Sequence, residues 1–221
     1  MDHIRKTWAL RTVVEYRSAC HTAELLHWLL VIAVSPDTLE VCHRIVGDEV
    51  AHADLSRECY LAAGGDLAAL PLSRDELSLR LEQGQPLELR ALAVAARIFC
   101  CGETVAVPLF LALRERVTEP SAVAALDRIV RDEATHRAFG WQLLDELLER
   151  LGEPGRAWLR ERTATYMAEI EEAYQAYGTA TVAEGPAWGL MAPVRYGEIT
   201  RTCVAEVIRP RFEKRGLVVP C

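Results

Sequence analysis

Two glutamate–histidine pairs are the residues of this chain best suited to chemistry. Glu49 and His52 are three residues apart, and so are Glu133 and His136. Residues three apart lie on one side of a helix, so each pair can bind one metal ion or two neighbouring ions. The pairs end two nine-residue segments that match at six of nine positions and lie 84 residues apart (136 − 52 = 84). The chain therefore contains an internal repeat, which is stronger evidence for a site than one pair alone.

Both pairs lie on helix sides that otherwise carry core residues. The two stripes are Cys42, Ile45, Glu49, His52 and Ser56, and Leu126, Ile129, Glu133, His136, Gly140 and Leu143. Burial of ionisable groups costs free energy unless they are paired or coordinated, and a metal ion provides both charge compensation and bonds. We therefore expect a metal site inside a helix bundle rather than two solvated Glu–His pairs.

A two-metal carboxylate site in a bundle takes one more glutamate from each of the other two helices. Glu103 is the carboxylate in an otherwise apolar part of the third helix. The first helix offers Glu15 and Glu24, which are nine residues apart and therefore on opposite sides at about 100° per residue. Glu15 shares its side with Trp8 and Leu29, whereas Glu24 lies on a mostly polar stripe that looks solvated. Burial favours Glu15, and Glu24 is the alternative.

Four glutamates and two neutral imidazoles balance the charge of two divalent cations. Mixed oxygen and nitrogen donors suit iron or manganese better than a sulfur-seeking metal, so we expect two iron ions, with manganese or a mixed pair as alternatives. Asp48 and Asp132 precede two of the glutamates and could each accept the second ring N–H of a histidine on the facing helix. An exposed helix acid is an equally good interpretation of both.

Other side chains near these motifs could line a substrate pocket or belong to the core, where aromatic and sulfur side chains at helical spacing are more often found. They are Tyr16, Cys20, Cys42, Cys100 and Trp141. Pro108, five residues after Glu103, removes an intrahelical hydrogen bond and should distort the third helix near the site. This distortion could open a path for substrate or O₂, or be a simple packing kink.

Helical periodicity between Pro and Gly punctuation predicts an all-α chain without strands. The expected bundle helices span about 4–34, 36–63, 87–117 and 121–151, and residues 64–86 form a long crossover between the second and third helices, with a short helical piece near 75–81. Two more helices are expected over 156–177 and 194–208, the last ending at Pro210. We thus expect a four-helix bundle with its di-metal site over 1–152 and a helical extension over 153–221 packed on it, as a single domain.

Composition limits the classes of function. The net charge of −7 and pI near 5.5 argue against a nucleic-acid partner, because phosphate binding needs clustered Lys and Arg. The seven cysteines, an odd number without a CxxC motif, are read as reduced thiols. No signal-peptide pattern precedes the first helix, and the apolar run 25–34 is too short to span a bilayer. We expect a cytoplasmic protein without membrane contact, with a small-molecule substrate, an electron donor as a further partner, and a homodimer as one assembly.

The motifs resemble those of the ferritin-like superfamily of binuclear non-haem iron carboxylate proteins, and within it bacterial ferritin-like domain proteins of unassigned activity. The resemblance rests on segments 15–18, 48–53, 101–104 and 132–136, and it also selects Glu15 and Glu103 as ligands. It implies an oxidoreductase, a di-iron oxidase or monooxygenase, that activates O₂ to oxidise or oxygenate a small organic substrate. The alternative is an iron-handling protein, a ferroxidase or a peroxide-reducing member of the superfamily.

Overall fold

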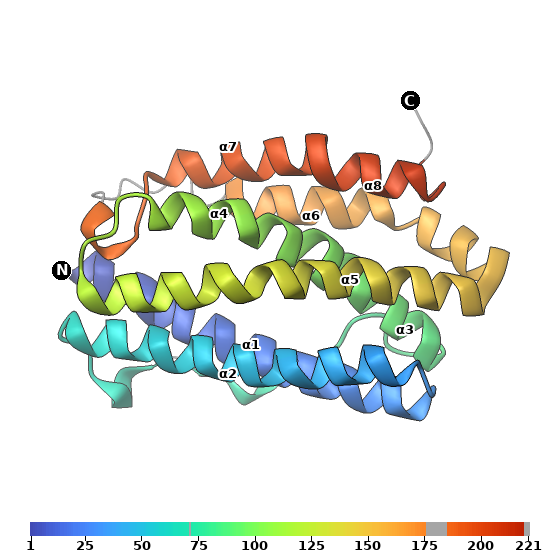
Figure 1. Ribbon diagram of the computed structural model, residues 1–221, viewed down its shortest axis with the longest axis horizontal. Helices are drawn as coiled ribbons and strands as arrows, with labels where there is room; N and C mark the ends of the chain where they lie inside the picture. The colour runs from blue at the N-terminus through green and yellow to red at the C-terminus, as the bar shows by residue number, and fades with distance from the viewer. Residues whose placement is uncertain (71, 176–184, 219–221) are drawn as a thin grey trace.

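The computed structural model describes residues 1–70, 72–175 and 185–218, and this part of the chain is helical without strands. Figure 1 shows three layers of roughly parallel helices. The first layer is α1 with α2, the middle layer is the third helix with α5, and the last layer is α6, α7 and α8. The all-helical prediction is confirmed.

The first hairpin forms as its sequence predicts. Helix α1 spans Asp2–Val31 and α2 spans Pro36–Ala62. The Ser35 side chain accepts a hydrogen bond from the Thr38 amide, and Pro36 lies in the first turn, where its missing N–H is not needed. The crossover that follows contains the 3₁₀ turns η1 (Leu67–Ala69) and η2 (Arg74–Glu76). The helical piece expected near 75–81 is thus only one turn long.

The third helix contains a wide central segment. It consists of α3 (Leu87–Val94), the π-helical segment η3 (Ala95–Glu103) and α4 (Thr104–Arg114), which follow one another without a break. Pro108, where the sequence predicts a distortion, lies inside α4, and the π-helical segment lies upstream of it and ends at Glu103. Leu87–Arg114 is the described stretch long and apolar enough to cross a membrane, and 56% of its most apolar window is buried, as in a core helix.

The predicted boundaries after residue 120 are partly wrong. Helix α5 spans Pro120–Arg160, but Gly152 adopts φ 60° and ψ −149°, so a break at the expected position separates the bundle helix from a short second piece. That piece ends before α6 (Thr163–Gln175), so the helix predicted over 156–177 is divided, and its last residues lie outside the described ones.

The last helix does not end at Pro210. It runs through α7 (Pro193–Cys203), the π-helical segment η6 (Val204–Ile208) and α8 (Arg209–Lys214). Because Pro210 lies in the first turn after η6, its missing N–H and fixed φ are tolerated there. The predicted stop at this proline is therefore wrong.

The layers are joined by close apolar contacts. At Gly140 of α5 an added Cβ atom would lie 2.4 Å from Phe99 Cβ, so the absence of a side chain lets α5 approach η3 closely. The next residue, Trp141, packs on Phe212 of α8 with ring centroids 5.0 Å apart. The first contact thus holds the two helices of the middle layer together, and the second joins this layer to the last one.

Candidate metal centre

The structure brings the six expected ligands together between the first and middle layers. Glu15 comes from α1, Glu49 and His52 from α2, Glu103 from the end of η3, and Glu133 and His136 from α5. Five of them are buried, with 6% or less of their surface exposed, and Glu103 is half-buried. The centre is therefore largely enclosed by packed helices.

Two groups of three ligand atoms can each hold a metal ion. One atom from each of Glu15, Glu49 and His52 lies within 4.8 Å of the other two, and the same holds for Glu49, Glu103 and His136. Glu49 belongs to both groups, which makes it the carboxylate placed to join two ions. Glu133 lies beside the second group, with Oε2 3.9 Å from His136 Nδ1 and a hydrogen bond to Glu103.

Several buried polar atoms point into this centre without a hydrogen-bond partner among the described atoms. They include Nδ1 of His52, Nδ1 of His136, Oε2 of Glu49 and Oε2 of Glu133. The Nδ1 atom of His136 lies 3.3 Å from Glu49 Oε1, and His52 Nδ1 lies 3.8 Å from Glu49 Oε2. Buried polar atoms are normally hydrogen-bonded, so this set of nitrogen and oxygen atoms without hydrogen-bond partners fits a bound cation.

The glutamates repel one another in the absence of a cation. Burial, followed by the charge of Glu49, raises the pKa of Glu15 well above its usual value and that of Glu103 to about 7. Burial and the charge of Glu103 likewise raise the pKa of Glu133. For Glu49, burial acts in the same direction, but the proximity of His136 and His52 outweighs it and lowers the pKa. The metal-free centre thus holds protons that a cation would displace.

Each histidine faces the aspartate of the opposite repeat. His52 Nε2 donates to Asp132 Oδ2 at 3.2 Å, and His136 Nε2 lies 3.5 Å from Asp48 Oδ2. Because an ionised carboxylate only accepts, His52 carries its proton on Nε2 and turns its Nδ1 lone pair toward the glutamates. His136 Nε2 faces Asp48 without a hydrogen bond. The crossed hydrogen bonding expected from the sequence is therefore present at His52, whereas at His136 the two groups only lie close together.

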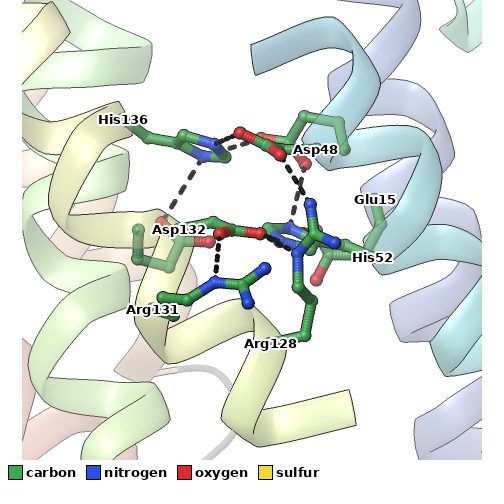
Figure 2. A network of polar contacts seen from close by, with 9 residues as sticks. Glu15, Asp48, His52, Arg128, Arg131, Asp132 and His136 are labelled. Atoms are coloured by element: carbon green, nitrogen blue, oxygen red, sulfur yellow. Dashed lines mark hydrogen bonds and ion pairs between the residues drawn. The ribbon is translucent and has the colours of Figure 1, made fainter. Parts of the chain in front are cut away.

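Arg128 connects the two aspartates, as Figure 2 shows. Its Nη2 donates to Asp48 Oδ1 at 2.7 Å, and its Nε donates to Asp132 Oδ2. Arg131 adds a bond from Nε to Asp132 Oδ1 at 3.0 Å. Partial burial alone would raise the pKa of Asp132, but the hydrogen bonds from Arg128, Arg131 and His52 lower it to about 2.

Sequence reasoning missed both arginines as part of the site. Arg128 carries a signal that could have been used, because it opens the repeat segment, where Arg44 is its counterpart four residues before Asp48. Arg131 has no such signal, since the first copy has Gly47 in its place.

Glu24 lies away from this centre. Its Oε2 accepts a hydrogen bond from the Leu79 amide at 2.8 Å, so it binds the crossover. Two neighbours on the same stripe do so as well: His21 Nε2 donates to the Glu76 carbonyl at 2.9 Å, and Arg17 pairs with the Glu76 carboxylate at 3.4 Å. The expectation that this stripe is solvated is wrong, because the crossover packs on it.

The suggested pocket residues do not form one pocket. Tyr16 has 42% of its surface exposed, and Cys20 is half-buried. Cys42 and Cys100 are fully buried in the core, where burial raises the pKa of both thiols. Trp141 is buried as well, and its Nε1 donates to Thr104 Oγ1 at 3.1 Å. Tyr16 and Cys20 are therefore surface residues, and Cys42, Cys100 and Trp141 are core residues.

Pro108 lines a groove of about 550 Å³ between the middle and last layers. Its other walls include Thr104, Leu111, Arg137, Ile199 and Cys203. Thr104 and Arg137 directly follow Glu103 and His136, so the groove lies behind the two helices that carry these ligands. Its size is in the range of small-molecule sites.

Comparison with known proteins gives no match at a significant level, either to a family model, to a curated protein or to a solved structure. The chemistry of the site therefore has to be read from its own residues. Three carboxylates and two imidazoles, arranged as two groups with one shared glutamate, could hold metal ions, and the buried Glu133 lies beside the second group.

Proposed function

We propose that this protein is a ferritin-like non-haem di-iron oxidoreductase that activates O₂ to oxidise or oxygenate a small organic substrate. The observation that carries the proposal is the pair of ligand groups that share Glu49, with unpaired Nδ1 atoms of both histidines turned toward them. Carboxylate oxygens together with imidazole nitrogens suit iron or manganese. Iron bound there would supply the redox chemistry that the side chains lack.

The chain's own residues have separate tasks in this proposal. Glu15 and His52 would hold one ion and Glu103 and His136 the other, and Glu49, which belongs to both groups, could serve either. Glu133 would complete the second position. The protons that Glu15 and Glu103 hold in the metal-free state would leave on metal binding, because coordinated carboxylates are ionised.

The surroundings of the centre also fit a small oxidant and an organic substrate. Five ligands are sealed by packed helices, and burial raises the pKa of the Glu103 carboxyl, so the centre is largely enclosed. The groove along Thr104 and Pro108 offers space for an organic molecule next to the helix segment that ends in Glu103. Water would be excluded from the buried side of the centre, which strengthens electrostatic interactions there.

The test is anaerobic loading with ferrous iron, metal analysis, and optical spectroscopy after exposure to O₂. We expect about two irons per chain, as the two ligand groups predict, and a transient absorption after mixing with O₂. A chain that takes up no iron contradicts the metal centre. Slow growth of a mineral containing many irons per chain favours the alternative, in which iron is the substrate of a ferroxidase or storage protein.

A further inference from the structure

Arg128 is placed to act on both metal positions at once. Its guanidinium is the only described group that bonds both Asp48 and Asp132, and these aspartates face the Nε2 atoms of His136 and His52. Asp48 and Asp132 are 14% and 10% exposed and Arg128 is 35% exposed, so the ion pairs are partly shielded from water. Partly buried ion pairs are screened less than fully exposed ones.

The two copies of the repeat differ in what their first arginine contacts. Arg44 has the same position in the first copy as Arg128 in the second, four residues before the aspartate. Arg44 is exposed, and no hydrogen bond or ion pair involves it among the described residues. One arginine therefore serves both aspartates, although the sequence offers two.

Geometry explains why a single guanidinium is sufficient. Its N–H groups form a rigid planar fork, and here Nε points to one carboxylate and Nη2 to the other. The fork fixes the carboxylates of two different helices relative to each other. Asp132 in turn fixes the tautomer and ring orientation of His52 through a hydrogen bond, and Asp48 lies 3.5 Å from His136 Nε2, where its charge favours a proton on that nitrogen.

We propose that Arg128 is a positioning residue that holds both histidines with Nε2 protonated and Nδ1 free for a metal ion, and so couples the two metal positions. This inference rests on the proposed metal centre for its effect on metal binding. The effect on the histidine rings does not depend on any metal. The two parts can therefore be tested separately.

The first experiment is a titration of the chelator-treated chain with Co(II), followed by visible absorption of the bound ion. Arg128→Gln should weaken both binding steps by about 10–100-fold, the usual effect of losing such a supporting partner. Arg44→Gln, the matched control from the other copy of the repeat, should bind as the unchanged chain does. Asp132→Asn should act mainly on the step that involves His52.

The second experiment measures the ring ¹⁵N resonances of His52 and His136 in the metal-free chain, at a pH where both rings are neutral. We expect one tautomer, protonated at Nε2, in the unchanged chain and in Arg44→Gln, and a mixture of tautomers in Arg128→Gln. An arginine that only ties α2 to α5 would lower thermal stability without changing the tautomers. That result would overturn the proposal.

The outcomes separate the two ideas. If the unchanged chain binds no Co(II), the metal centre fails, and the ring resonances still decide what Arg128 does. If it binds two ions and Arg128→Gln behaves like Arg44→Gln in both experiments, only the role of Arg128 fails. If circular dichroism shows that Arg128→Gln does not fold, Arg128→Lys replaces it. A compact ammonium cannot span both carboxylates as the fork does, so it should shift both measurements in the same direction.

Discussion

At the scale of single residues, burial gives chemically identical side chains different tasks. Glu15 and Glu24 belong to one helix, yet Glu15 is 6% exposed and lies among carboxylates and histidines, whereas Glu24 binds a backbone amide of the crossover. A carboxylate held by an amide is already satisfied, but one that faces three other carboxylates is not. Only the second kind gains from a cation.

We expect Glu15→Ala to reduce metal binding to about one ion per chain or less, because it removes a ligand from the group with Glu49 and His52. Glu24→Ala is the matched variant on the same helix and should keep two ions. Metal analysis after loading and desalting measures both. Loss of metal in Glu24→Ala with retention in Glu15→Ala would show that the ligand assignment is wrong.

The protonated glutamates predict how stability depends on pH. In the metal-free chain the pKa of Glu103 is raised to about 7, and that of Glu15 and Glu133 is raised as well, so the folded chain binds more protons than the unfolded one above about pH 4.5. The free energy of unfolding should therefore fall as pH rises from about 4.5 to 7, by about 1.4 kcal/mol per pH unit for each such proton. Urea denaturation of the chelator-treated chain measures this slope.

Two variants test that slope. Glu103→Gln removes one titrating group and should make the slope shallower, whereas Glu149→Gln, at an exposed position of α5, should leave it unchanged. A stability that rises over this pH range would contradict the protonated centre. Saturation with metal should reverse the trend, because ions and protons compete for the same oxygens.

At the scale of elements, the π-helical segment η3 is the part of the fold that places Glu103. Such segments are rare and occur often at functional sites. Here the segment passes Gly140 of α5 at its closest approach, with Phe99 and the Cys100 backbone against the glycine. Glu103 follows four residues after Phe99, so the fit at Gly140 and the position of the ligand are linked.

We expect Gly140→Ala to lower the free energy of unfolding by about 1–3 kcal/mol, because its Cβ would lie 2.4 Å from Phe99 Cβ and 2.9 Å from the Phe99 carbonyl carbon. Metal affinity should fall too, as η3 moves away from α5. Gly47→Ala is the control: nothing lies within 4 Å of its added Cβ, and it should stabilise α2 by about 0.5–1 kcal/mol. Equal stability of the two variants would argue against the close fit.

At the scale of the whole molecule, the last layer shares one core with the middle layer and satisfies its polar groups. Pro108 has no N–H to offer the Thr104 carbonyl four residues earlier. The thiol of Cys203 in α7 donates to that carbonyl instead, at 3.5 Å. Arg215 adds two bonds to Asp145 of α5, at 2.6 and 2.7 Å. We therefore expect the three layers to unfold together.

Phe212→Ala tests whether the three layers unfold cooperatively. The side chain is fully buried against Trp141, so its removal should cost about 3–5 kcal/mol. Glu213→Ala, at the exposed neighbouring position, should stay within about 0.5 kcal/mol of the unchanged chain. Urea denaturation followed by circular dichroism and by tryptophan fluorescence should give coincident transitions, and separate ones would mean that the last layer detaches by itself.

Much of this molecule is determined by the sequence over short distances. Capping residues determine the helix ends at Ser35 and Gly152, and the Pro- and Gly-rich stretch between helices determines the long crossover. Periodicity within a few turns determines the helix sides that carry the two Glu–His pairs. Local rules failed at Pro210, where a preceding π-helical segment gives the proline a first-turn position.

Only the tertiary structure decided the contacts between distant segments. The crossover packs on the polar stripe of α1 and gives Glu24 its partner, and Arg128 reaches across to the opposite copy of the repeat. Both depend on the register and distance between packed helices, which no local pattern encodes. The Glu–His repeat thus determined by itself which residues could bind a metal, and the packing of the helices decided which groups meet them and hold them in place.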